Sequence, residues 1–284
     1  MKAKQILAEI GIEPKKSLGQ NFCVDENLSG CVFDFLKTEV EKNNIEEIWE
    51  IGPGLGALSE KIFELKLPTR LFEIDQRLKS HLEKLCSGFS GAELHWGDFL
   101  EVDADALSEK TRGNFLICGN LPYSCGTAII RKAIALKKKP AKMLFLLQRE
   151  VSKKASAKPA TDDYGFLSAA VQLFAEAKSG ATFSQGSFYP NPKVLSSLLE
   201  LTPLKLNSEE IRVREKALNI ASVTFSQRRK ASLSVLKKNL PISGESWEDK
   251  FERLKIPANI RFEAMPLELL IKLAESIECI PEKK

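Results

Sequence analysis

The segment Ile45-Glu46-Glu47-Ile48-Trp49-Glu50-Ile51-Gly52-Pro53-Gly54-Leu55-Gly56 determines the fold class of this chain. A mostly apolar run leads directly into a turn of closely spaced glycines, and apolar residues recur at helical spacing beyond it. This pattern predicts a strand, a tight turn and a helix, which together form the first half of a nucleotide-type α/β unit. Glycines in such a turn let the backbone approach a ligand closely.

The spacing of these glycines indicates what kind of ligand the turn would hold. Gly-x-Gly-x-Gly differs from the Gly-x-Gly-x-x-Gly of dinucleotide sites, and Glu50 would be a poor neighbour for a pyrophosphate. An acidic residue beside the turn suits a cationic ligand instead. S-adenosylmethionine is such a ligand, because it carries an ammonium and a sulfonium and no phosphate. The alternative is a tight strand-to-helix turn with no ligand.

Carboxylates follow two further predicted strands. The strand 70–74 ends at Glu73-Ile74-Asp75, about twenty residues past the glycines, which is the offset at which a carboxylate reaches a ribose diol. Glu73 is the first candidate for this role and Asp75 the second. The strand 92–96 is followed by Asp98, which can accept a hydrogen bond from an adenine amino group. Each carboxylate alone is equally compatible with a solvated loop, so the prediction rests on their occurrence at successive strand ends.

A fourth predicted strand, 115–118, runs into Asn120-Leu121-Pro122-Tyr123. Open α/β sheets place their ligands at the carboxyl ends of the strands. At that edge Tyr123 can stack on a planar ring, while Asn120 and the neighbouring backbone carbonyls can accept hydrogen bonds from an exocyclic amine. This combination suits an amino-heterocycle. The alternative is a plain turn after a core strand, capped by the Asn.

The remaining pattern predicts an α/β domain over residues 1–203 and a small all-helical domain over 204–284. Strands alternate with helices up to residue 203, which favours a parallel sheet finished by an antiparallel strand. Other expected elements are a helix over 2–10, a helix capped by Asp25, a helix over 128–136, a strand over 143–147, a mobile loop over 149–163, a helix over 164–177, and strands over 181–184 and 197–201. In the second domain, helices are expected near 208–224, 230–239, 246–254 and 266–277.

Composition bounds the class of partner. The 284 residues include 42 Lys and Arg against 38 Asp and Glu, so the net charge of +4 does not by itself indicate a polyanionic partner. Basic clusters at 137–142, 149–158, 228–230 and 237–238 are typical of phosphate contacts, although each is also compatible with a solvated face. Six Cys without a C-x-x-C pair, and two His, argue against a metal site and favour a reducing, cytoplasmic setting. We expect no membrane span, because no apolar run is long enough.

Taken together, the motifs resemble the ribosomal RNA adenine dimethyltransferase family, a family of class I S-adenosylmethionine-dependent methyltransferases. The resemblance covers nearly the whole chain. It rests on Leu18–Phe22, Glu50–Gly56, Glu73–Asp75, Gly97-Asp98, Asn120–Tyr123, Tyr164–Ser168, Phe188–Val194 and Phe225–Lys230. It implies a Rossmann-like domain with a mostly parallel seven-stranded sheet, followed by a small helical RNA-recognition domain.

The resemblance also implies specific roles for residues. The cofactor, S-adenosylmethionine, would be bound by Asn21, Cys23, Gly52, Glu73, Asp98 and Asn120. Methyl transfer would take place at Asn120, Leu121, Pro122 and Tyr123. The implied substrate is small-subunit rRNA in an immature small ribosomal subunit, methylated at the N6 atoms of two adjacent adenosines near its 3′ end during ribosome biogenesis. A monomeric cytoplasmic enzyme without metal or membrane partner is expected.

Three departures from the family pattern are visible. Cys23 stands where Leu is usual, Ser124-Cys125-Gly126 replaces Asn-Ile-Ser, and Leu195 replaces Asp. Two alternatives stay open at this point. One is an Erm-type methyltransferase of large-subunit rRNA, against which Leu121 argues because the Erm pattern usually has Ile there. The other is a non-catalytic RNA-binding assembly factor, against which the intact Asn120, Glu73 and Asp98 argue.

Overall fold

A computed structural model describes residues 2–278, without the side chain of Lys2. Contacts between residues divide the chain into two compact units. The first contains the residues up to Ser152 together with Lys178–Pro203, and the second contains Lys153–Ala177 together with the residues from Leu204 onward. The segment Lys153–Ala177 therefore groups by its contacts with the C-terminal helices, whereas the sequence analysis assigns it to the 1–203 domain.

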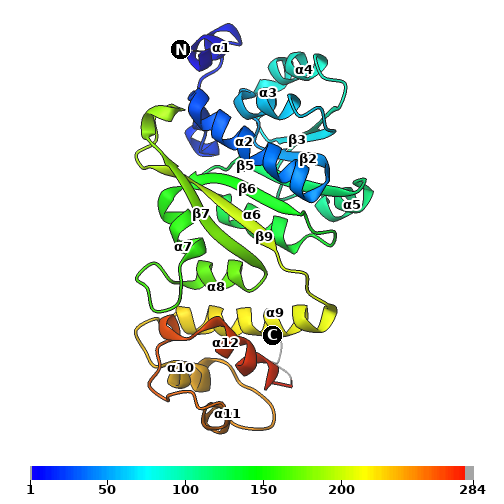
Figure 1. The fold of residues 1–284 in the computed structure, drawn as a ribbon. Helices are drawn as coiled ribbons and strands as arrows, with labels where there is room; N and C mark the ends of the chain where they lie inside the picture. Colours follow the sequence, from blue (N-terminus) through cyan, green and yellow to red (C-terminus); the bar gives the residue numbers. More distant parts are fainter. Residues whose placement is uncertain (1, 279–284) are drawn as a thin grey trace. The chain divides into compact units, whose positions relative to one another are not determined.

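The first unit is built around a seven-stranded sheet with the order β4-β3-β2-β5-β6-β9-β7 (Figure 1). The strands are β2 (Ile45–Ile51), β3 (Thr69–Glu73), β4 (Ala92–Trp96), β5 (Asn114–Asn120), β6 (Lys142–Gln148), β7 (Ala175–Phe183) and β9 (Ser196–Pro203). The first five are joined by parallel pairing, and β9 pairs antiparallel with β6. The predicted mostly parallel, seven-stranded Rossmann-like sheet is confirmed.

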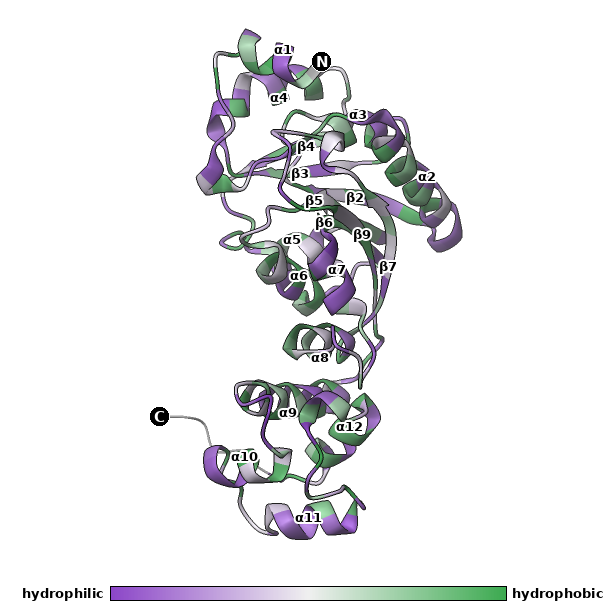
Figure 2. Cartoon of the chain, turned by 90° about the vertical axis from the view of Figure 1, so that its left-hand side faces the viewer, coloured by the Kyte–Doolittle hydropathy of each residue, from purple (hydrophilic) through white to green (hydrophobic). Residues whose placement is uncertain are grey.

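Helices cover both faces of the sheet. On one face α2 (Glu26–Asn43) and α3 (Ala57–Phe63) bury Leu28, Val32 and Ile62 against β2, β5 and β6. On the opposite side lie α5 (Ala104–Lys110) and α6 (Gly126–Ala135) (Figure 2). Asp25 caps α2 as predicted, since its side chain accepts a hydrogen bond from the Asn27 amide at 2.9 Å. The helices α1 (Lys2–Glu9) and α4 (Lys79–Ser87) complete this unit.

A second, two-stranded sheet was not predicted. In it β1 (Phe22–Cys23) pairs antiparallel with β8 (Phe188–Tyr189). The Ser187 hydroxyl donates to the Asp25 carboxylate at 2.6 Å, next to this pair. The pairing fixes the chain that precedes α2, and strands of two residues carry too little periodicity to be recognised in the sequence.

The second unit is helical. Its helices are α8 (Phe166–Gln172), α9 (Ser208–Phe225), α10 (Ser232–Asn239), α11 (Trp247–Arg253) and α12 (Leu267–Glu275). They enclose one apolar core in which Ile220, Trp247, Phe251 and Phe262 are buried. The helices from α9 onward match the four predicted segments to within two residues at either end. Their boundaries were predictable because capping boxes at Asn207 and at Ser246 mark where α9 and α11 begin.

Two expectations in the middle of the chain are wrong. The expected mobile loop over 149–163 begins instead with α7 (Arg149–Ser156), a mostly hydrophilic helix (Figure 2). It is tied to the sheet because the Ser152 hydroxyl donates to the Leu198 carbonyl at 2.9 Å. The expected helix over 164–177 ends at Gln172, and β7 begins at Ala175. The sequence from 175 to 181 is rich in Ala and favours helix, but its place at the edge of the sheet beside β9 overrides that preference.

Candidate active site

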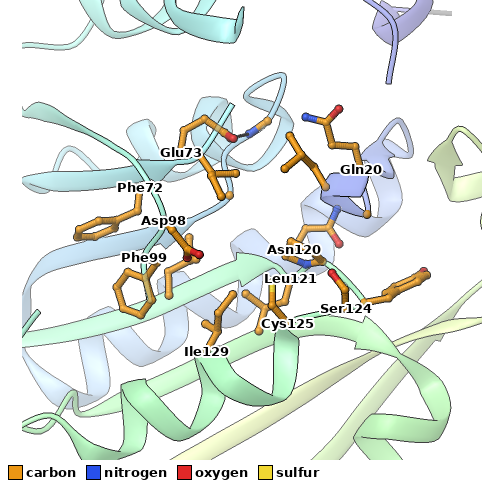
Figure 3. A pocket seen from close by; sticks show the side chains of 18 of the residues that line it. Gln20, Phe72, Glu73, Asp98, Phe99, Asn120, Leu121, Ser124, Cys125 and Ile129 are labelled. Carbon is orange, nitrogen blue, oxygen red and sulfur yellow. Dashed lines mark hydrogen bonds between the residues drawn. The ribbon is translucent and has the colours of Figure 1, made fainter. Parts of the chain in front are cut away.

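A cavity of about 270 Å³ opens at the carboxyl edge of β2, β3, β4 and β5, entirely within the first unit. It brings together eight of the nine predicted site residues, namely Asn21, Gly52, Glu73, Asp98, Asn120, Leu121, Pro122 and Tyr123 (Figure 3). The ninth, Cys23, lies instead in a small adjoining cavity, which Gly52 and Asn120 also line. Its thiol is buried, and this burial raises its pKa to about 11, so the thiol stays protonated at neutral pH.

The Glu73 carboxylate is held by two backbone amides at the end of β3. Its Oε2 accepts from the Gly54 amide at 3.0 Å and its Oε1 accepts from the Asp75 amide at 2.8 Å. The side chain is only 4% exposed, and this burial raises its pKa while the amide hydrogen bonds oppose the rise. The carboxylate therefore faces the cavity in a fixed orientation, with lone pairs left to accept from hydroxyl groups.

The Glu50 carboxyl is the most deeply buried acid of the site. Ser59 donates to its Oε2 at 2.6 Å, while its Oε1 has no hydrogen-bond partner among the described residues. Burial raises its pKa to about 8, and the nearby Glu73 charge contributes in the same direction. Glu50 lines the small cavity beside the glycine turn. An unpaired buried carboxyl oxygen there suits a positively charged ligand group, because a cation would favour the ionised form.

Asp98 and Phe99 follow β4 and form the opposite wall of the cavity (Figure 3). The Asp98 side chain accepts from the Leu100 amide at 2.8 Å, which shapes the turn. Phe99 is buried and packs edge-on against Phe72, with ring centroids 5.2 Å apart. Lys132 secures the turn from α6, since its Nζ donates to the Leu100 carbonyl at 2.8 Å and lies 5.4 Å from the centroid of the Phe99 ring.

The Asn120 side chain lies at the end of β5 in a defined orientation. Its Nδ2 donates to the Asn21 carbonyl at 2.8 Å. The amide oxygen, its only acceptor, is therefore left for the cavity. The Pro122 carbonyl accepts from the Gly126 amide at 2.9 Å at the start of α6, whereas no backbone amide among the described residues donates to the Leu121 carbonyl. Of these two carbonyls, that of Leu121 thus offers the better acceptor.

The Tyr123 ring is half-buried on the wall of the cavity, and its hydroxyl is 2.9 Å from the Ser196 hydroxyl. Ser196 is the first residue of β9 and is 1% exposed. Burial raises the pKa of Tyr123, so its hydroxyl stays neutral. No local pattern indicates this partner, because Ser196 lies 73 residues further along the chain.

Two other residues of the site were missed. Ile74 lines the cavity and is 45% exposed, an unusual exposure for a large apolar side chain in this protein. Gln20 also lines the cavity, and its Nε2 donates to Asp75 Oδ2 at 2.8 Å. Asp75 accepts in addition from Arg77 at 2.6 Å, so this second candidate for the ribose is already paired within the protein. The position of Ile74 between two acidic residues was the signal that could have marked it.

Several basic side chains of the clusters predicted to contact phosphates make hydrogen bonds or ion pairs within the protein. Lys138 and Lys139 donate to the carbonyls of Thr111 and Ile134, both at 2.7 Å. Arg228 forms an ion pair with Glu263 at 2.6 Å. Residues 2–278 contain no cluster of three or more His, Cys, Asp or Glu suited to a metal ion. Across the same residues, no helix combines the length and the apolar character that a bilayer crossing requires.

A Rossmann-like sheet with a glycine turn after β2, a buried carboxylate after β3 and Asn-Leu-Pro-Tyr after β5 defines a class I S-adenosylmethionine-dependent methyltransferase. The family profile described as ribosomal RNA adenine dimethylase matches residues 12–278. The chain belongs to this family.

Relatives support the assignment along the whole chain. A ribosomal RNA small subunit methyltransferase A from Geobacillus sp. (strain WCH70) is 34% identical over 286 residues, covering 98% of this chain and 96% of the relative. The protein of the same name from Bacillus licheniformis is 33% identical, with 89% and 86% covered.

Solved structures share the fold. A dimethyladenosine transferase from Plasmodium falciparum superimposes with a TM-score of 0.69 at 22% identity, covering 84% of this chain and 94% of that one. The 23S rRNA methyltransferase ErmE gives 0.64 at 20% identity, with 90% and 98% covered. At these sequence identities, the similarity to the two structures establishes the fold alone.

Proposed function

We propose that this protein transfers methyl groups from S-adenosylmethionine to the N6 atoms of two adjacent adenosines near the 3′ end of small-subunit rRNA, during ribosome biogenesis in the cytoplasm. We further propose that it acts as a monomer. The proposal draws on the family membership and on the relatives named as small subunit methyltransferases. The observation that carries it is the Asn120 amide, whose nitrogen is bound to the Asn21 carbonyl so that its oxygen is left for a substrate amine.

The residues present fit the cofactor. Glu73 offers fixed, buried carboxylate oxygens to a ribose diol, and Asp98 lies across the cavity where an adenine amino group would need an acceptor. The unpaired Glu50 oxygen marks the side of the glycine turn that suits the cationic methionine end. The turn itself favours glycine at position 54, since a Cβ there would lie 3.0 Å from the Phe22 ring and the φ is +58°. When bound, S-adenosylmethionine supplies an electrophilic methyl group on a sulfonium.

The protein's task is then to orient the amine. The exocyclic amine of adenine is a weak nucleophile, because its lone pair is delocalised into the ring. Asn120 Oδ1 and the Leu121 carbonyl can accept hydrogen bonds from the two N–H groups of this amine. These bonds favour a pyramidal nitrogen with a localised lone pair. Transfer would form an N–CH₃ bond as the methyl C–S bond breaks and leaves a neutral thioether, and the resulting acidic ammonium would lose its proton to solvent, so no strong base would be required. Tyr123 stacks on the flipped or unpaired base, an interaction worth about 1–3 kcal/mol.

Methyl transfer to small ribosomal subunits that lack the modification tests this function. We expect two methyl groups on each of two adjacent adenosines, and no transfer to large-subunit RNA. Methylation of large-subunit RNA alone would support the Erm-type alternative. Cofactor binding by calorimetry without transfer to either RNA would support a non-catalytic assembly factor.

A further inference from the structure

The segment Glu13–Asn21, here called the strap, forms one wall of the cavity. Residues 17–22 line the cavity together with the four residues of the Asn-Leu-Pro-Tyr turn. A Cβ built on Gly19 would lie 3.3 Å from the Cβ of Pro122, and Gly19 has a φ of +61°. Close approach and left-handed backbone both require glycine at this position. The position of the strap therefore bears directly on the geometry of the catalytic turn.

A buried carboxylate fastens the strap to the end of β3. Asp75 is 4% exposed and accepts two hydrogen bonds from the Arg77 guanidinium, at 2.8 and 2.6 Å, and one from Gln20 Nε2 at 2.8 Å. The same guanidinium donates to the Glu13 carbonyl at 3.2 Å, and Gln20 Oε1 accepts from the Lys15 amide at 2.7 Å. Two points of the strap, Glu13 and Gln20, are thus attached to one charged pair, and Lys15 is held through Gln20. Hydrogen bonds in which the donor or the acceptor is ionised are shorter and stronger than neutral ones.

At its other end the strap contacts Asn120. The Asn21 carbonyl, one residue beyond Gln20, accepts from Asn120 Nδ2 at 2.8 Å. A primary amide has one oxygen and one NH₂ group, so fixing the nitrogen decides where the oxygen points. If Asn21 moves, the Asn120 amide loses its partner and is free to rotate. The attachment at Asp75 and the orientation of Asn120 are therefore linked through two adjacent residues of the strap.

We propose that Gln20, Asp75 and Arg77 are positioning residues that act through the strap to orient the Asn120 amide oxygen toward the target amine. This inference rests on the catalytic role proposed for Asn120. It assigns Asp75 to the protein's own network, in place of its earlier candidacy for the ribose. Gln20 is the residue of choice for a test, because its removal leaves the Asp75–Arg77 pair intact and no buried charge without a partner.

The experiment compares Gln20→Ala, Asn120→Ala and the double variant in single-turnover methylation with cofactor and RNA at saturation. We expect Gln20→Ala to lower the rate about tenfold or more, since small misplacements at a reacting centre carry penalties of up to about 10²-fold. In the Asn120→Ala background, Gln20→Ala should have no further effect. Glu93→Gln serves as the control, because Glu93 pairs with Arg70 at 2.9 Å on the neighbouring strand and does not line the cavity.

Hydrogen exchange provides a readout that does not depend on activity. In the cofactor-free Gln20→Ala protein, amides of residues 15–21 should exchange faster than in the wild type, while those of β5 should not change. Equal rate losses from Gln20→Ala in both backgrounds, or an unchanged rate in the single variant, would overturn the role of the strap alone. An unchanged rate in Asn120→Ala would instead overturn the proposed role of Asn120, and this inference with it.

Discussion

Replacing Glu73 tests the cofactor site most directly. Its carboxylate is 4% exposed and faces the cavity with both oxygens oriented by backbone amides. A buried acceptor of this kind contributes about 1.5–3 kcal/mol to a hydrogen-bonded ligand group that would otherwise lose its partner. Glu73→Ala should therefore weaken S-adenosylmethionine binding about 10- to 150-fold. Glu73→Gln should retain part of the affinity, because it keeps the volume and one acceptor oxygen.

Isothermal titration calorimetry of the isolated protein measures this effect without RNA. The Gly54 and Asp75 amides lose their acceptor in Glu73→Ala, so thermal unfolding must be followed in parallel to separate a folding defect from a binding defect. Glu93→Gln, at the exposed end of a neighbouring ion pair, is the matched control and should bind like the wild type. An unchanged dissociation constant in folded Glu73→Ala would refute the assignment of this carboxylate to the ribose.

Three further predictions concern pH, RNA and the target base. The pKa of Glu50 is raised from 4.5 to about 8, so its contribution to stability is fully present below pH 4.5 and is lost as the pH rises through about 8. The melting temperature of Glu50→Gln relative to that of the wild type should therefore be higher at pH 9 than at pH 5. The same difference in melting temperature at pH 5 and at pH 9 would contradict this. Arg229→Ala should lower RNA affinity and reduce the slope of its salt dependence by about one. Arg228→Ala, which breaks an ion pair with Glu263, should mainly lower the melting temperature. An unchanged salt slope for Arg229→Ala would mean that Arg229 has a structural role. Tyr123→Phe removes the partner of the buried Ser196 hydroxyl but keeps the ring, so its methylation rate should fall about fivefold, far less than that of Tyr123→Ala. Equal losses in the two variants would refute the stacking role.

Much of the site was predictable because it lies at strand ends. Glu73, Asp98 and Asn120 each follow a predicted strand, and parallel strands in one sheet bring their carboxyl ends to the same edge. The order of the motifs therefore sufficed to place them in one cavity. Local patterns also predicted the helix cap at Asp25, since a cap and its helix are adjacent in sequence.

The missed features depend on pairing between distant residues. Gln20 and Asp75 are 55 positions apart, and Tyr123 and Ser196 are 73 apart, so no local pattern connects them. The start of β7, residues 175–177, was predicted as helix because its Ala-rich sequence favours helix locally, whereas the predicted strand 181–184 overlaps its end. The hydrogen bond from Lys138 to the Thr111 carbonyl, 27 positions away, was likewise not predictable from a local pattern.

In the proposed mechanism, the distribution of donors and acceptors in this cavity accounts for amine methylation without a base. A neutral amine presents N–H groups, so the site has to offer oriented oxygens. Asn120 does so because its nitrogen is bound to the Asn21 carbonyl, and two backbone amides hold Glu73 in the same way for the cofactor ribose. Burial raises the pKa of Tyr123 and of Cys125, so neither becomes a base near neutrality. Reactivity then depends on how precisely these acceptors are held. The hydrogen bonds that orient them, above all the one from Asn120 to the Asn21 carbonyl, therefore matter as much as the oxygens that face the substrate.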